Sequence, residues 1–324
     1  MSEGLPSGPT LSVTLAGITF PTPVLSAPGP LEFGRQVQAA YDLRAFGGIV
    51  TKSVTLEPRE GHPGPQTVEV TGGWLNAVGL RNPGVAGFIA RDLPFLRTLG
   101  RPIIVSIAGH RSDEYAALAE LLSDEEGVAA LELNVSCPNV EDGLHFGTDP
   151  HRTHALVAAV RARTPLPLFV KLSPNVADIT VVARAAADGG ADGLALINTL
   201  NALAVDARAR RMRLGAGTGG LSGPAIKPVA LRMVWDVAQA VRLPIIGMGG
   251  IATWEDAVEF LLCGAHAVAV ASALIDNPRA AEEITDGLRA YMAEVGIERV
   301  TDLIRALEGM DNVPHSGPDG SAGR

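Results

Sequence analysis

Eight short apolar runs, each followed by an amphipathic stretch, are the feature that most constrains how this 324-residue chain can fold. Short runs rich in Val, Ile, Leu and Ala are typical of buried parallel strands, whose two faces are both covered. The predicted strands are Val24–Ser26, Gly48–Lys52, Ile103–Ile107, Ala130–Val135, Leu168–Leu172, Gly193–Ile197, Pro244–Gly247 and Ala267–Ala271.

The stretches between these runs have the spacing of helices with one apolar face. The predicted helices include Arg35–Phe46, Val85–Leu99, Asp113–Leu122, Arg152–Arg163, Ile179–Asp188, Pro228–Ala240, Trp254–Leu262 and Arg279–Tyr291. Because the strand–helix alternation reaches eight and the length suits one domain, we predict an α/β fold of the (β/α)8 TIM-barrel type. An open doubly wound sheet is the alternative.

Three segments that follow predicted strands are longer than ordinary turns: Thr55–Gly84 after strand 2, Cys137–Gly147 after strand 4 and Leu200–Gly223 after strand 6. The carboxyl ends of the strands form the active-site face of a barrel, so we expect these insertions to build its rim. Residues 1–311 are expected to form a single domain, and the polar, Gly- and Pro-rich tail 312–324 to be disordered.

Charge and cysteine content exclude several classes of function. A net charge of −9 argues against a nucleic-acid surface, which needs clustered Lys and Arg. Two distant cysteines, Cys137 and Cys263, form neither a disulfide framework nor a metal cluster, so we expect no metal and a reduced, cytoplasmic setting. No apolar run reaches ~18 residues and the N-terminus is unlike a signal peptide, so no membrane contact is expected.

Cys137 lies just past a predicted strand, in the run Asn134-Val135-Ser136-Cys137-Pro138-Asn139. Barrel enzymes keep catalytic groups at this position. A thiol acts as a base or nucleophile when its pKa is lowered or the substrate proton is acidic. The alternative is a buried structural cysteine, which is our interpretation of Cys263 inside a predicted helix.

Two lysines, Lys52 and Lys171, end predicted strands 2 and 5. An ammonium group at the end of a buried strand is unfavourable unless it meets an anion or a polar ligand. Either lysine alone could extend to the solvent at the rim. Together they predict an electron-rich ligand in the mouth of the barrel.

Glycine-rich turns follow the last strands: Gly247-Met248-Gly249-Gly250 after strand 7, Ala271-Ser272 after strand 8, and the run 217–223 upstream. Glycines let backbone N–H groups approach a phosphate, and the loops after strands 7 and 8 are the usual phosphate site of barrels. Tight turns without a ligand are the alternative.

Four amides also fall at or just beyond predicted strand ends: Asn76, Asn134, Asn139 and Asn198. An amide offers a donor and an acceptor together, which matches the alternating N–H and C=O edge of a pyrimidine. Each one alone could be a turn residue, so the prediction depends on the set.

Together these residues resemble class 1 dihydroorotate dehydrogenase from about Leu11 to Leu307. Within that span, Leu56–Gly61 and Asn139–Pro150 resemble the catalytic FMN subunit of the NAD-linked B subtype more than the fumarate-linked A subtype. The similar motifs are Thr51-Lys52-Ser53, Asn76-Ala77-Val78-Gly79-Leu80, Asn134 to Asn139, Lys171-Leu172-Ser173-Pro174-Asn175, Ile197-Asn198-Thr199 and Gly219-Gly220-Leu221-Ser222-Gly223-Pro224.

The resemblance implies oxidation of dihydroorotate to orotate in de novo pyrimidine (UMP) biosynthesis, with Cys137 removing the C5 proton and N5 of FMN receiving a hydride from C6. The implied substrate-binding residues are Lys52, Asn76, Ala77, Val78, Gly79, Leu80, Asn134, Asn139, Asn198 and Thr199. The implied FMN-binding residues are Ala27, Lys52, Ser53, Ser106, Asn134, Lys171, Ile197, Gly223, Gly249, Gly250, Ala271 and Ser272.

The chain departs from the family pattern around the flavin. Ala27-Pro28-Gly29 stands where the family has Ala-Ser-Gly, Ser106 where it tends to have Asn, and Ala271-Ser272 where it has Gly-Thr. The departures concern flavin affinity and potential more than the substrate.

The resemblance also implies partners: a homodimer core, and an electron-transfer subunit that carries FAD and a 2Fe–2S cluster. Two cysteines are fewer than the four that such a cluster needs, and no GxGxxG run follows a predicted strand. A second protein must therefore bind NAD if NAD is the final acceptor.

Three other functions are compatible with parts of the pattern. The first is a flavin reductase of another dihydropyrimidine, such as dihydrouracil, or of dihydrouridine in tRNA, which the acidic charge disfavours. The second is a non-redox phosphate-binding barrel, such as an aldolase with Lys171 as a Schiff base. The third is an inactive binding barrel, which Cys137 and the lysine pair disfavour.

Overall fold

A parallel eight-stranded sheet forms the centre of the protein, whose computed structural model describes residues 8–135 and 146–308. The strand order is β3-β16-β15-β10-β9-β8-β7-β4, and hydrogen bonds from Ser26 N to Gly48 O (3.1 Å) and from Gly47 N to Val24 O (2.8 Å) join its two edges. The predicted (β/α)8 barrel is therefore confirmed. Its strands are β3 (Val24–Ser26), β4 (Ile49–Val50), β7 (Ile103–Ile107), β8 (Val128–Asn134), β9 (Leu168–Lys171), β10 (Gly193–Leu196), β15 (Ile245–Met248) and β16 (Ala267–Val270).

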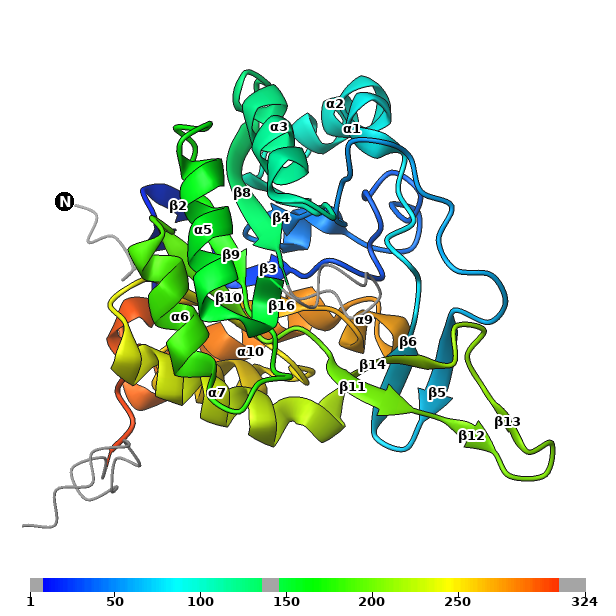
Figure 1. Ribbon diagram of the computed structural model, residues 1–324. Helices are drawn as coiled ribbons and strands as arrows, with labels where there is room; N and C mark the ends of the chain where they lie inside the picture. Colours follow the sequence, from blue (N-terminus) through cyan, green and yellow to red (C-terminus); the bar gives the residue numbers. More distant parts are fainter. Residues whose placement is uncertain (1–7, 136–145, 309–324) are drawn as a thin grey trace, which may run out of the picture.

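The helices lie outside these strands (Figure 1). Helices α6 and α8 begin and end where the sequence predicts, and α3, α5, α7 and α10 lie within a few residues of prediction. Residues 84–97 are helical but include a π-helical turn, η2 (Phe88–Asp92), between α1 (Gly84–Gly87) and α2 (Leu93–Arg97). The remaining helices are α3 (Ser112–Ser123), α5 (Pro150–Arg161), α6 (Ile179–Asp188), α7 (Lys227–Ala240), α8 (Trp254–Leu262), α9 (Ala273–Asp276) and α10 (Ala280–Val295), with short 3₁₀ turns η3 (Pro224–Ile226) and η4 (Val300–Leu303).

The prediction of a helix at Arg35–Phe46 was wrong. This segment is a series of turns that ends in a short 3₁₀ helix, η1 (Leu43–Ala45), in which the Asp42 carboxylate accepts a hydrogen bond from Arg44 N. Between residues 35 and 42 only Val37 and Tyr41 are even half-buried. Because most of the stability of a short helix comes from packing one apolar face, this segment has too little apolar surface to hold one.

The insertions after barrel strands 2 and 6 join into one antiparallel sheet of order β11-β14-β6-β5 at the mouth of the barrel. Its strands are β5 (Thr67–Val70), β6 (Gly73–Asn76), β11 (Leu200–Leu203) and β14 (Thr218–Ser222). The pairing of β6 with β14 places Asn76 opposite Gly220 and Trp74 opposite Ser222. Most of the predicted insertion after strand 4, residues 137–147, lies outside the described residues, as does the tail 312–324.

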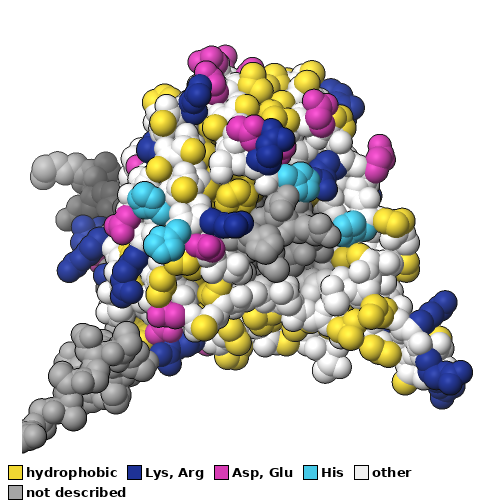
Figure 2. Space-filling view, in the orientation of Figure 1, with side chains coloured by type: hydrophobic (Ala, Val, Ile, Leu, Met, Phe, Trp, Pro, Cys, Tyr) yellow, Lys and Arg dark blue, Asp and Glu magenta, His cyan; other side chains and the backbone are white. Residues whose placement is uncertain are grey.

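A hairpin of β12 (Val205–Asp206) and β13 (Arg211–Met212) continues this sheet as a projecting arm (Figure 1). Lys and Arg side chains gather at its tip (Figure 2). At the N-terminus, the hairpin of β1 (Val13–Leu15) and β2 (Ile18–Phe20) packs its buried side chains with Leu288 and Met292 of α10. In the part of the chain that the structure describes, no helix has the length and apolar character needed to cross a bilayer.

The interior of the barrel is filled by the side chains that alternate inward along each strand, among them Phe169, Ala195 and Ile246. Gly193 makes room for the largest of these, because a Cβ atom at Gly193 would overlap the ring of Phe169. The two residues are also register partners on β10 and β9. The size of Phe169 thus requires a glycine on the next strand.

We expect Gly193→Ala to lower the free energy of unfolding by about 1–3 kcal/mol, the usual effect of overpacking a core. Urea denaturation measures this change. Gly8→Ala is the control, because a Cβ atom at Gly8 meets nothing within 4 Å. A Gly193→Ala protein as stable as the control would show that the barrel interior is not packed in this way.

Candidate active site

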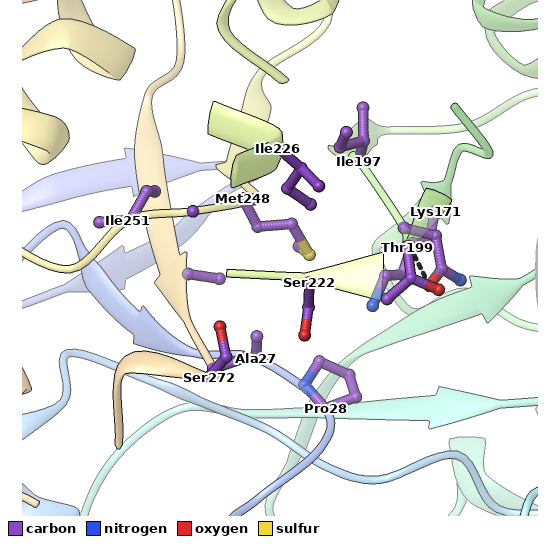
Figure 3. A pocket seen from close by; sticks show the side chains of 15 residues that line it. Ala27, Pro28, Lys171, Ile197, Thr199, Ser222, Ile226, Met248, Ile251 and Ser272 are labelled. Atoms are coloured by element: carbon purple, nitrogen blue, oxygen red, sulfur yellow. Dashed lines mark hydrogen bonds between the residues drawn. The ribbon is translucent and has the colours of Figure 1, made fainter. Parts of the chain in front are cut away.

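A cavity of about 370 Å³ lies at the mouth of the barrel, between the strand ends and the insertion sheet. A smaller cavity of about 80 Å³, the glycine-turn cavity, lies beside Gly249 and Gly250 (Figure 3). The two form one crevice, because both are lined by Pro28, Lys171, Asn198, Thr199, Ser222, Ala271 and Ser272.

Most of the predicted substrate-binding residues meet in the mouth cavity. Ala77 does not line it, because its side chain is buried in a small cluster with Leu75. Cys137 and Asn139 lie outside the described residues. The predicted substrate-binding residues that line the cavity are Lys52, Asn76, Val78, Gly79, Leu80, Asn134, Asn198 and Thr199.

The predicted cofactor-binding residues spread over both cavities. Ser106 and Gly223 line neither: Ser106 is fully buried behind Ser53, and Gly223 lies behind Gly250. The glycine-turn cavity is lined by Ala27, Ile197, Gly249 and Gly250, the mouth cavity by Lys52, Ser53 and Asn134, and both by Lys171, Ala271 and Ser272.

The two lysines at the strand ends are buried rather than extended to solvent. Lys171 is 6% exposed, and the side chain of Lys52 is 11% exposed. Burial lowers the pKa of Lys52, while the Glu32 carboxylate, 2.7 Å from Lys52 Nζ, opposes that shift. The third lysine of the chain, Lys227, pairs with Asp256 at 2.6 Å. Most basic residues of this chain are arginines, and two of its three lysines lie in this crevice.

A chain of hydrogen bonds fixes the amides of the mouth cavity. Asn134 Nδ2 donates to Ser53 Oγ (2.8 Å), and Ser53 Oγ lies 3.0 Å from Ser106 Oγ. Asn198 Nδ2 donates to Asn134 Oδ1 (3.3 Å), while Asn198 Oδ1 accepts from Thr199 N (2.8 Å). The network orients these side chains before a ligand arrives, which favours binding of a ring with alternating donors and acceptors.

The turn after β15 requires glycine. Gly249 and Gly250 have φ values of +124° and +81°, which side-chain-bearing residues rarely adopt. A Cβ atom at Gly250 would lie 2.9 Å from Gly223 O and 2.9 Å from Lys227 N. Backbone rather than side chains therefore borders this end of the crevice, where Figure 3 shows Ser222 and Ser272 directed toward the same space. Such a cradle fits a phosphate group.

Several residues of the crevice were not predicted from the sequence. Glu32 and Arg81 line the mouth cavity beside Lys52, and Trp74 and Gln66 line it from the insertion. Glu32 could have been noticed as the one acid in the Gly- and Pro-rich run that follows the first strand. The partners of Glu32 are far away in the sequence, so its role required the fold.

Glu132 was also missed. It lies on β8 two residues before Asn134, so it faces the barrel interior, and Asn134 is the register partner of Lys171. Glu132 is 1% exposed, and both of its carboxylate oxygens are buried without a hydrogen-bond partner among the described residues. Burial raises the pKa of Glu132, and the charge of Lys171 opposes that shift. Glu132 is thus an ionisable group beneath the floor of the crevice.

No group of three or more His, Cys, Asp or Glu residues within residues 8–135 and 146–308 is placed to hold a metal ion.

The raised pKa of Glu132 predicts a pH-dependent stability. The folded state binds this proton more tightly than the unfolded chain, where the pKa is ~4.3, so the contribution to stability falls as the pH rises above that value. We expect Glu132→Gln to be more stable than wild type by about 1–3 kcal/mol at pH 8, with the difference vanishing near pH 4. Chemical denaturation across this range is the measurement, with the exposed Glu69→Gln as control. A difference that is constant with pH would contradict the assignment.

Three comparisons with known proteins agree on one family. The family profile described as "Dihydroorotate dehydrogenase" matches residues 10–292. The protein "Dihydroorotate dehydrogenase B (NAD(+)), catalytic subunit" of Geotalea uraniireducens (strain Rf4) is 51% identical over 300 residues, which cover 92% of this chain and 98% of the relative. The protein of the same name from Desulforudis audaxviator (strain MP104C) is 51% identical over 296 residues, covering 91% and 96%.

A solved structure supports the fold. The crystal structure of DHODH from Eimeria tenella in complex with ferulenol matches with a TM-score of 0.77 at 23% identity, over 94% of this chain and 90% of the other. The structural match shows the fold alone, whereas the sequence matches, at 51% identity over more than nine-tenths of both chains, show the family. The chain is an oxidoreductase that belongs to the dihydroorotate dehydrogenase family.

Proposed function

We propose that this chain oxidises dihydroorotate to orotate, in the biosynthesis of pyrimidines, with FMN as its cofactor. The observation that carries the proposal is the single crevice in which two buried lysines, an ordered set of amides and a glycine cradle meet. Membership of the family disfavours the non-redox barrel considered above.

The residues of the crevice fit FMN. The cradle of Gly249 and Gly250 suits its phosphate, and Lys171 lies where the two cavities meet, so its ammonium would stabilise negative charge on the flavin. FMN supplies the acceptor for a hydride from C6 of dihydroorotate. FAD fits less well, because Gly223 and Lys227 close the space behind Gly250.

The amides and a tight turn would bind the pyrimidine. Asn76, Asn134 and Asn198 present donors and acceptors to the mouth cavity, and the turn at Gly79 and Leu80 faces the same space. Both turn residues have positive φ, and a Cβ atom at Gly79 would lie 2.7 Å from His62 N. Lys52 supplies the positive charge that the carboxylate of the substrate requires.

We assign proton abstraction to Cys137, which lies outside the described residues but follows Asn134 by three positions. The Cys137 thiolate takes the C5 proton, the C5–H electron pair forms the C5=C6 double bond, and the hydride leaves C6. Asn134, held by Ser53 and by the hydroxyl of Tyr115 at its carbonyl (3.0 Å), anchors the chain just before this segment.

Cys137→Ala tests the chemistry. We expect bound FMN and orotate affinity to be retained, while stopped-flow reduction of the flavin by dihydroorotate slows by about 10²–10⁴-fold, the usual effect of losing a general base. Cys137→Ser should recover partly at high pH, because a hydroxyl ionises with more difficulty than a thiol. Cys263→Ala is the matched control. Reduction of Cys137→Ala at the wild-type rate would show that another group is the base.

The relatives are named as catalytic subunits, which supports a complex in which one chain oxidises the substrate and a second chain passes the electrons on. We propose that electrons leave for a partner that carries FAD and a 2Fe–2S cluster, and that this chain forms a homodimer core. Two cysteines cannot hold the cluster.

The isolated chain should therefore reduce artificial dyes with dihydroorotate but form almost no NADH, and addition of the cognate partner should restore NADH formation, followed at 340 nm. Rapid NAD reduction by this chain alone would contradict the proposal that a partner chain is needed for electron transfer to NAD. Rapid fumarate reduction would instead assign the A subtype.

A further inference from the structure

Glu32 bridges two cations at the mouth cavity. Its carboxylate lies 2.7 Å from Lys52 Nζ through one oxygen and 3.0 Å from an Arg81 guanidinium nitrogen through the other. All three residues line the cavity. Exposure increases outward, from 11% for the Lys52 side chain through 28% for Glu32 to 51% for Arg81. The three side chains thus form a charge triad that runs from the floor of the cavity to its rim.

The triad carries a net charge of +1, from two cations and one anion. Without Arg81, the ion pair of Glu32 with Lys52 would be neutral, and an incoming carboxylate would meet a lysine that is already paired. With Arg81 present, one more anion can be accommodated. The result would be two neutral pairs: the ligand carboxylate with Lys52, and Glu32 with Arg81.

We propose that Glu32 and Arg81 determine the preference of this site for a monoanionic ligand. Glu32 holds Lys52 while no anion is bound, and it pairs with Arg81 alone when the carboxylate of the ligand takes Lys52. The inference rests on the proposed function, in which dihydroorotate and orotate are the ligands. It adds two specificity-determining residues to Lys52.

The exchange follows from the cost of burying charge. A buried ammonium without a partner is strongly unfavourable, so Lys52 needs an anion in both states. Burial lowers the pKa of Lys52, and the hydrogen bond and charge of Glu32 oppose this, so Glu32 keeps the ammonium protonated. Because Glu32 already contacts Arg81, the exchange needs no more than a small movement of one side chain.

A purely structural role would behave differently. If Glu32 only fastened the loop after β3 to the barrel, removal of Glu32 or Arg81 would weaken every ligand in the same direction. The charge triad instead predicts opposite effects of the two substitutions, confined to anionic ligands. Uracil serves as the neutral comparison, because it is orotate without the carboxylate.

The experiment is a titration of the flavin-loaded protein with orotate and with uracil, followed by the flavin absorbance. We expect Arg81→Gln to weaken orotate about tenfold, and Glu32→Gln to tighten it by about threefold or more. Uracil affinity should change less than about twofold in either variant. Glu69→Gln on β5 of the insertion sheet and Arg211→Gln on β13 of the projecting arm are matched controls, because they make the same changes of net charge at positions that do not line the mouth cavity.

A second readout needs no ligand. The chain has three lysines, Lys52, Lys171 and Lys227, so the titration of each can be followed by NMR with lysine labelled at Cε. We expect the pKa of Lys52 to fall in Glu32→Gln and to rise in Arg81→Gln, because Glu32 supports the ammonium and Arg81 opposes it. The Lys227 signal, which belongs to a separate ion pair, should not change.

The outcomes separate the two proposals. Loss of orotate and uracil affinity together in both variants, control variants that shift orotate equally, or an unchanged pKa of Lys52 would each overturn the role of the triad. A wild-type protein that binds uracil but not orotate would overturn the proposed substrate, and the exchange with it.

Discussion

The burial of two ammonium groups at the mouth of the barrel is the constraint on which the rest of the site depends. Lys171 ends β9 and Lys52 follows β4 by two residues, and both lysines line the barrel mouth rather than extend to solvent. A cation in this position requires compensation. Glu32 supplies it for Lys52, and Lys171 interacts electrostatically with the buried carboxyl of Glu132. The two lysines therefore differ in their surroundings: Lys52 has a half-buried carboxylate in direct contact, whereas Lys171 has a buried acid whose pKa is raised by burial.

The insertion sheet gives these charges an enclosed space in which to act. The barrel alone offers strand ends, but β6 and β14 place Asn76, Trp74 and Ser222 over them. Two segments nearly 150 residues apart thereby form one wall, and the hydrogen bond from Asn76 Nδ2 to Gly220 O (3.2 Å) closes it. Exclusion of water by this wall strengthens every interaction of the lysines with a bound anion.

Local sequence was sufficient for the barrel and for much of the site. The eight apolar runs predicted all eight strands, because strands buried on both faces leave a continuous apolar signature. Lys52, Lys171 and the amides could be proposed from their positions at strand ends. The prediction of a helix at Arg35–Phe46 was wrong because a periodic pattern does not show whether the apolar side chains of the segment are buried against the rest of the protein. The roles of Glu32, Arg81 and Glu132 could not be predicted, since they depend on partners that only the fold brings near.

The central claim is that one crevice holds FMN at the glycine cradle and a pyrimidine carboxylate at Lys52. A crystal structure of the protein with FMN and orotate tests it most directly. We expect the flavin phosphate against Gly249 and Gly250, Lys171 at the flavin, the orotate ring among Asn76, Asn134 and Asn198, and its carboxylate on Lys52. A flavin phosphate bound elsewhere would contradict the account. So would an orotate carboxylate directed away from Lys52 while Glu32 keeps its ion pair with Lys52.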